Sequence, residues 1–164
     1  MYKMSTPTQH KRILSVDPGY ERLGVAIIEN NELIFSDCFQ TDKKFSHSKR
    51  LGELGERLEK VIEKYKPTIF ALETLFFSNN QKTALLVSEA RGMLLYIAEK
   101  NKLEVREFSP AEVKIGVTGY GRSTKDQIMS MVPKIIHIDK KITYDDEYDA
   151  IAVGITCAAT NRIS

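Results

Sequence analysis

Apolar residues in the first quarter of the chain are grouped in three short runs separated by turn residues. The runs cover residues 12–17, 23–28 and 32–41, with Pro18-Gly19 and Asn30-Asn31 at the two breaks. Short runs between turn residues are typical of strands, and in the third run Leu33, Phe35 and Asp37 alternate with Ile34, Ser36 and Cys38. Because a tight turn joins the last two runs, the pattern predicts three strands in an antiparallel meander.

The period of the pattern changes after residue 50. Apolar residues then recur at the spacing of an amphipathic helix that should end before Pro67: Leu51, Leu54, Leu58, Val61, Ile62 and Tyr65. Residues 68–73 and 103–108 are two further short apolar runs, and the helical pattern of residues 81–100 separates them. A strand that follows a helix in this way returns to the same sheet by a crossover connection.

Helix starts dominate the rest of the chain. Ser109-Pro110 with Glu112, and Thr124 with Gln127, have the spacing of capping boxes. Residues 145–160 predict a closing helix that is apolar on most sides and packs against the sheet. We find no repeat, linker or low-complexity segment, so the sequence predicts one α/β domain at 12–164, after a disordered leader at 1–11.

Composition narrows the class of protein. A chain of 164 residues with 42% hydrophobic and 28% charged side chains has the composition of one ordinary globular domain. Its net charge of +2 excludes histone-like binding of nucleic acid but allows a locally basic groove. No apolar run approaches the roughly 20 residues of a membrane span. Cys38 and Cys157 have neither metal-site nor disulfide-framework spacing, so we expect buried, reduced thiols in a cytoplasmic protein.

Four carboxylates stand at the ends of predicted elements. Asp17 and Glu73 each end a strand, and Asp146 and Asp149 lie one helical turn apart in the last helix. Taken singly, such acids are usually solvated caps. If the two strands are neighbours and the helix crosses their ends, all four converge and repel one another. Mg²⁺ or Mn²⁺ would neutralise such a set, and two ions about 3.5–4 Å apart can support phosphodiester hydrolysis.

These acids lie within an ordered series of motifs. The series reads Val16-Asp17-Pro-Gly19, Leu72-Glu73-Thr-Leu-Phe-Phe77 with Asn80, Thr83-Ala-Leu85, Ala90-Arg-Gly92 and Asp146-x-x-Asp149-Ala-Ile-Ala. From about Arg12 to about Ala159 the chain resembles the RuvC family of bacterial crossover junction endodeoxyribonucleases. The resemblance implies an RNase H-like mixed five-stranded sheet with helices on both faces. It also implies metal-dependent resolution of four-way (Holliday) DNA junctions by symmetric paired nicks with 5′-phosphate ends, during recombination and repair.

The resemblance assigns the catalytic and metal-binding roles to Asp17, Glu73, Asp146 and Asp149, with two Mg²⁺ ions per site and Mn²⁺ as the alternative. Asp17 would bridge the two ions, whereas Asp146 occupies a position where the family varies between Asp and His. Asp145 and Glu147 add charge that the family pattern does not require. We expect both to be solvated, with Asp145 as an alternative metal ligand.

The resemblance further implies a set of DNA-binding residues: Phe76, Asn80, Arg91, Lys114 and Lys125. Phe76 would stack on unpaired bases at the junction centre, and its neighbour Phe77 is the better candidate for the core. The two lysines match family lysines near the scissile phosphate, or are ordinary lysines on helix surfaces. Residues 100–141 carry nine Lys and Arg against five Asp and Glu, a net of +4 that suits a phosphate-binding face.

The expected partners are four-way junction DNA, a second copy of the chain and the RuvA–RuvB branch-migration complex, with no membrane. The helix around Ala90, Arg91 and Met93 is the expected subunit contact, and Gly92 would allow another helix to approach closely.

Three other functions share part of this pattern. Another RNase H-like nuclease, acting on a different DNA or RNA, would have the same carboxylates. A phosphotransferase of the actin and sugar-kinase type also ends its first strand in Asp-x-Gly, but it needs a second lobe and a second phosphate loop. A module that binds junctions without cutting would require a lost acid, and none of the four is missing.

Overall fold

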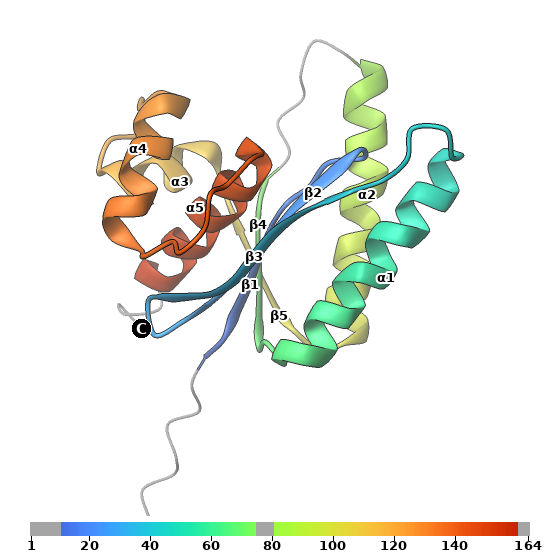
Figure 1. Ribbon diagram of the computed structural model, residues 1–164, viewed down its shortest axis with the longest axis horizontal. Helices are drawn as coiled ribbons and strands as arrows, with labels where there is room; N and C mark the ends of the chain where they lie inside the picture. Colours follow the sequence, from blue (N-terminus) through green and yellow to red (C-terminus); the bar gives the residue numbers. More distant parts are fainter. Residues whose placement is uncertain (1–10, 75–80, 161–164) are drawn as a thin grey trace, which may run out of the picture.

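The computed structural model describes residues 11–74 and 81–160, and its five strands form one mixed sheet in the order β3-β2-β1-β4-β5 (Figure 1). The strands are β1 (Ile13–Asp17), β2 (Arg22–Glu29), β3 (Glu32–Gln40), β4 (Ile69–Glu73) and β5 (Glu104–Phe108). The first three form the predicted antiparallel meander, and β4 and β5 add in parallel beside β1. The predicted strands are confirmed to within one residue at each end.

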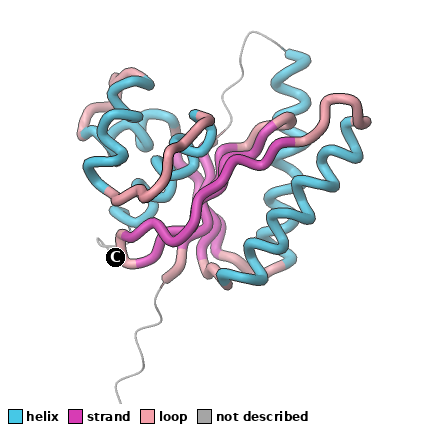
Figure 2. The backbone as a smooth tube through the Cα atoms, viewed as in Figure 1, coloured by secondary structure: helices cyan, strands magenta, loops and turns pink. Residues whose placement is uncertain are grey.

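The helices cover the sheet on both faces (Figures 1 and 2). One layer contains α1 (His47–Tyr65) and α2 (Gln81–Lys100); the other contains α3 (Pro110–Thr118), α4 (Lys125–Ile135) and α5 (Asp145–Thr160). Both predicted capping boxes are present, and α1 ends at a left-handed Lys66 just before Pro67. None of the helices in the described part of the chain is long and apolar enough to cross a membrane.

Each central strand contributes side chains to two cores. Leu14 and Val16 of β1 pack with α1 and α2, whereas Ile13 packs with α5 on the opposite face. Burial on both faces explains why these strands are continuous apolar runs in the sequence rather than alternating ones.

The helix α5 packs so closely against β1 and β2 that glycine is needed at two points of contact. A Cβ atom on Gly24 of β2 would lie 1.9 Å from the carbonyl oxygen of Asp146, and a Cβ atom on Gly154 would lie 2.6 Å from Ser15 Oγ. The Ser15 hydroxyl donates a 2.7 Å hydrogen bond to the carbonyl of Ala150. The glycines therefore permit, and the hydroxyl fixes, the position of the helix across the strands.

A buried polar contact holds the first turn of α5 to the edge strand β3. Glu147 is only 5% exposed. Its Oε1 accepts a 2.5 Å hydrogen bond from Ser36 Oγ and forms an ion pair with Lys140 Nζ at 2.6 Å. Lys140 also donates to the Ser36 carbonyl at 2.6 Å. The expectation that Glu147 is solvated is wrong, because the phase of the helix turns this side chain toward β3.

The glycine that packs between α1 and α2 is Gly55, not Gly92. A Cβ atom on Gly55 would lie 3.3 Å from both Met93 Sδ and Ile97 Cδ1, whereas one on Gly92 would meet nothing within 4 Å. The close contact expected at Gly92 is therefore absent among the described residues of this chain, and a contact with a second copy stays a prediction.

The two cysteines are free and buried, as expected. Burial raises the pKa of the Cys38 thiol to about 12 and that of the Cys157 thiol to about 11.

Replacing Gly24 by alanine tests the close approach of α5. We expect Gly24→Ala to lower the free energy of unfolding by about 1–3 kcal/mol, because the clashing atom is a main-chain oxygen that cannot move without its helix. Urea unfolding of the metal-free protein measures the change. Gly52→Ala in α1 is the control: the new methyl group meets no other element within 4 Å, and alanine favours the helix by about 0.5–1 kcal/mol. Wild-type stability in Gly24→Ala would contradict the described packing.

Candidate active site

The strands β1 and β4 deliver two of the four predicted acids to the same edge of the sheet. They are parallel neighbours, with Val16 opposite Leu72 in the register, so Asp17 and Glu73 follow side by side. Each ends an otherwise fully buried strand and is itself only partly exposed. The expectation that these strands are neighbours is confirmed.

The first two turns of α5 bring the other two acids over this edge. Burial raises the pKa of Asp17 well above its ordinary value, and the charges of Asp149, Asp146 and Glu73 raise it further. The pKa values of Glu73 and Asp149 are also raised, first by burial and then by neighbouring carboxylates. Glu73, Asp146 and Asp149 therefore lie around Asp17, and the predicted convergence of the four acids is confirmed.

The acids converge without forming a closed coordination sphere. Among residues 11–74 and 81–160, no three His, Cys, Asp or Glu side chains are arranged so that they could hold one metal ion. The donor set nevertheless fits a hard divalent cation, since it consists of carboxylates alone and centres on Asp17, a partly buried acid that its neighbours repel.

Lysines on α3 and α4 border the acids. Lys125 Nζ lies 2.6 Å from Asp145 Oδ2 and 3.0 Å from Asp149 Oδ2, and the hydrogen bond to Asp145 lowers the pKa of that carboxyl. The charge of Lys114 opposes the rise in the pKa of Glu73. Both lysines thus lie beside the carboxylates, and their expected place near the scissile phosphate stays a prediction. Asp145 is engaged by Lys125 rather than simply solvated.

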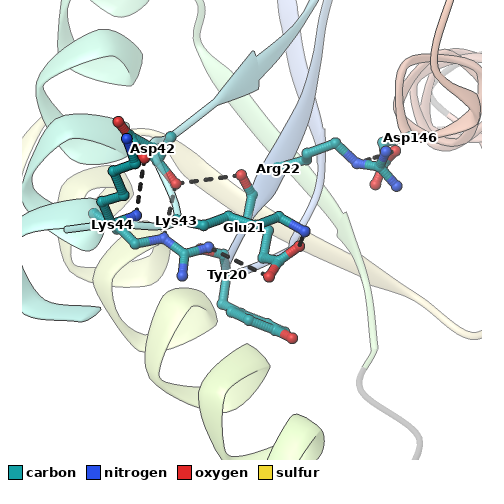
Figure 3. A network of polar contacts seen from close by, with 9 residues as sticks. Tyr20, Glu21, Arg22, Asp42, Lys43, Lys44 and Asp146 are labelled. Carbon is teal, nitrogen blue, oxygen red and sulfur yellow. Dashed lines mark hydrogen bonds and ion pairs between the residues drawn. The ribbon is translucent and has the colours of Figure 1, made fainter. Parts of the chain in front are cut away.

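A further cation, Arg22, reaches the site from the start of β2 (Figure 3). Its Nε lies 3.1 Å from Asp146 Oδ2, and its guanidinium lies over the Tyr144 ring, 5.1 Å from the centroid. Arg22 belongs to none of the motifs that the sequence pattern singles out. Its position in the sequence could have indicated it, because Arg22 follows Asp17 closely and is the first residue of the strand that runs back beside β1.

Arg91 lies behind the site. Its Nη1 donates a 2.8 Å hydrogen bond to the main-chain carbonyl of Glu73, and its Nη2 pairs with Glu107. The side chain is 13% exposed, so its visible role is to brace the end of β4, and its predicted contact with DNA stays a prediction. The other predicted DNA-binding residues, Phe76 and Asn80, and the core candidate Phe77 lie outside the described residues.

Comparison with known proteins gives a consistent result along the chain. The family model for crossover junction endodeoxyribonuclease RuvC matches residues 13–157. The RuvC proteins of Thermotoga maritima and Brachyspira hyodysenteriae are 41% and 38% identical to this chain, each over 92% of it and over 92% and 95% of their own lengths.

Solved structures show the same fold. Thermus thermophilus RuvC in complex with a Holliday junction substrate superposes with a TM-score of 0.86, over 94% of this chain and 96% of that one, at 24% identity. The yeast mitochondrial Holliday junction resolvase Ydc2 superposes with a TM-score of 0.65 over 90% of this chain and 77% of that one, at 13% identity. The predicted RNase H-like sheet with helices on both faces is confirmed. With its family model matched over nearly its whole length, the chain belongs to the RuvC family of crossover junction endodeoxyribonucleases.

Proposed function

We propose that this chain is a Holliday junction resolvase that cuts four-way DNA as a homodimer, using divalent metal ions held by Asp17, Glu73, Asp146 and Asp149. The observation that carries the proposal is the partly buried Asp17, whose pKa three other carboxylates raise, in a chain of the RuvC family. Repelling carboxylates of this kind are stable together when cations neutralise them.

The chemistry of hydrolysis divides between the ions and the side chains. When bound, Mg²⁺ or Mn²⁺ would supply an activated water and charge to stabilise the leaving oxygen. Asp17 would hold the ions together with the three acids whose charges act on it. Lys114 and Lys125, beside Glu73 and Asp149, supply positive charge for the phosphate that is cut. Cleavage then leaves 5′-phosphate and 3′-hydroxyl ends that ligase can join.

A dimer suits the symmetry of the substrate. Two strands of like polarity must be cut at matching positions, and one site on a domain of this size does not reach both. An isologous pair places two identical sites in a two-fold relation. We propose the outer side of α2 near Arg91 and Met93 as part of that contact, although Ala90 itself is buried within the chain, with Phe76 of each copy at the junction centre. We also propose that the dimer works with the RuvA–RuvB branch-migration complex in the cytoplasm.

A cleavage assay with three substrates tests the substrate class. Four-way junctions, linear duplex and RNA–DNA hybrid are each incubated with the protein and Mg²⁺. We expect paired nicks in the junction and little cutting of the other two. Preferential cutting of the hybrid or the duplex would favour an RNase H-like nuclease of another specificity.

The repulsion among the acids predicts how stability depends on pH and on metal. A raised pKa in the folded state means that the carboxyl group favours folding while it is protonated, so this contribution is lost as pH rises through the raised values of Asp17, Glu73 and Asp149. We expect Asp17→Asn to stabilise the metal-free protein at pH 7.5 by about 1.4 kcal/mol for each unit of raised pKa, and hardly at all below pH 4.

Urea unfolding at both pH values, with and without Mg²⁺, measures this effect. Mg²⁺ should stabilise the wild type and fail to stabilise Asp17→Asn. The exposed acid Asp139 provides the control, since Asp139→Asn removes one charge away from the site. Equal pH dependence in wild type and Asp17→Asn would show that the acids do not repel one another as described.

Single charge removals should separate cutting from binding. We expect Asp17→Asn, Glu73→Gln and Asp149→Asn each to abolish cleavage while junction binding is largely kept, because binding depends on basic residues and on the dimer. Asp146→Asn should be severe, whereas Asp146→His retains activity. Gel-shift and cleavage assays on the same preparations measure both properties. A fully active Glu73→Gln protein would remove Glu73 from the metal site.

Mixed dimers test the two-site arrangement. Active protein is mixed with an excess of Asp17→Asn protein and given a junction on a supercoiled plasmid. We expect mixed dimers to nick one strand and release a nicked, unresolved product. Paired cuts in proportion to the active protein alone, without single nicks, would contradict an exchangeable dimer.

A further inference from the structure

Each acid in the first two turns of α5 has a cation of its own chain beside it. Asp145 and Asp149 share Lys125, and Glu147 pairs with Lys140. Asp146 pairs with Arg22, which comes from the start of β2 (Figure 3). Of the two proposed metal ligands on α5, Asp146 in the first turn therefore pairs with Arg22, and Asp149 in the second turn pairs with Lys125.

The contact between Arg22 and Asp146 is an ion pair without an aligned hydrogen bond. Nε and Oδ2 are 3.1 Å apart, yet Oδ2 is buried and has no hydrogen-bond partner among the described residues. The Arg22 side chain is 42% exposed and rests over the Tyr144 ring, while Asp146 is 19% exposed. The guanidinium is therefore held by charge and by the aromatic face, and it is open to solvent on its outer side.

This arrangement places the charge of Arg22 3.1 Å from Oδ2 of a proposed metal ligand, so a metal ion held by that oxygen would meet the same charge. A guanidinium stays charged at every relevant pH, so it competes with a divalent cation for Oδ2 under all working conditions. It also binds phosphate with a geometry that suits its planar fork of donors. DNA backbone brought to the acids would offer Arg22 such a phosphate.

We infer that Arg22 is a resident counter-ion of Asp146, which weakens metal binding in the free protein and moves to a DNA phosphate when the substrate arrives. The inference rests on the metal-dependent function proposed above. It makes the binding of metal and of DNA mutually favourable. A metal ion at Asp146 releases Arg22 to bind a DNA phosphate, and a DNA phosphate that binds Arg22 removes the charge that competes with the metal ion. Such coupling is reciprocal between the two ligands.

The direction of one measurement separates this role from that of a structural brace. Removing a competing charge makes the site more negative and frees Oδ2, so metal binds more tightly. Removing a brace lets Asp146 move, so metal binds more weakly.

The test is a calorimetric titration of the DNA-free protein with Mn²⁺. We expect Arg22→Gln to bind Mn²⁺ about tenfold more tightly than wild type, an order of magnitude set by one unit charge beside the site. Arg22→Lys keeps the charge and should stay within about threefold of wild type. The control is Lys43→Gln, which removes an exposed charge that pairs with Glu21 at 3.1 Å and should leave the affinity unchanged.

The inference is overturned if the Mn²⁺ affinity of Arg22→Gln equals the wild-type value or is weaker. Circular dichroism of each variant confirms folding, and Arg22→Lys tests the charge independently where Arg22→Gln fails to fold. An Arg22→Lys protein that binds Mn²⁺ about tenfold more tightly would also overturn it, because the retained charge should still compete.

A second titration tests the transfer to phosphate. Junction affinity is measured by gel shift with and without Ca²⁺, whose flexible coordination disfavours the ordered geometry of hydrolysis. We expect Ca²⁺ to raise junction affinity at least about fivefold more in wild type than in Arg22→Gln, because only wild type has a charge to transfer. An equal rise in both proteins would overturn the transfer.

Failure of the proposed function has a separate signature. If wild-type protein with Mn²⁺ leaves four-way junctions uncut, the function is wrong, whereas the Mn²⁺ titration still decides whether Arg22 competes for Asp146.

Discussion

The main-chain contact between α5 and the meander is the constraint on which the site depends. At Gly24 the carbonyl of Asp146 occupies the space that any side chain would need, and further along the helix the side chain of Ser15 occupies that space at Gly154. Since the acids Asp146 and Asp149 belong to this helix, its distance from the sheet sets their distance from Asp17. A closely packed part of the core is therefore also the part that arranges the chemistry.

The second consequence of that contact is electrostatic. Packing α5 so closely brings negative charges to a sheet edge that already carries Asp17 and Glu73, and burial raises the pKa values of both. The chain offsets this repulsion with lysine and arginine from other elements rather than by separating the acids. The free protein thus carries its own cations around a site that is suited to divalent ones.

Much of the fold could be predicted because its signals are local. The strand runs, the capping boxes and the stop at Pro67 each depend on a few neighbouring residues, and the structure matches them closely. The convergence of Asp17 and Glu73 also followed, since two neighbouring parallel strands end at one edge. Arg22 and the buried Glu147 could not be found in this way, because their positions depend on strand register and on the rotational phase of α5. The same holds for Gly55, which exchanges its expected role with Gly92 only when the two helices are seen packed.

The two thiols of the core have a practical consequence for spectroscopy. A thiol reacts through its thiolate, and pKa values of about 12 for Cys38 and about 11 for Cys157 leave almost none of that form at neutral pH. They are the only cysteines in the chain. A cysteine introduced at the exposed Tyr96 of α2 would therefore accept a spin label or a fluorophore selectively, in an otherwise unaltered sequence. The distance between two such labels would report how two copies sit together on and off DNA.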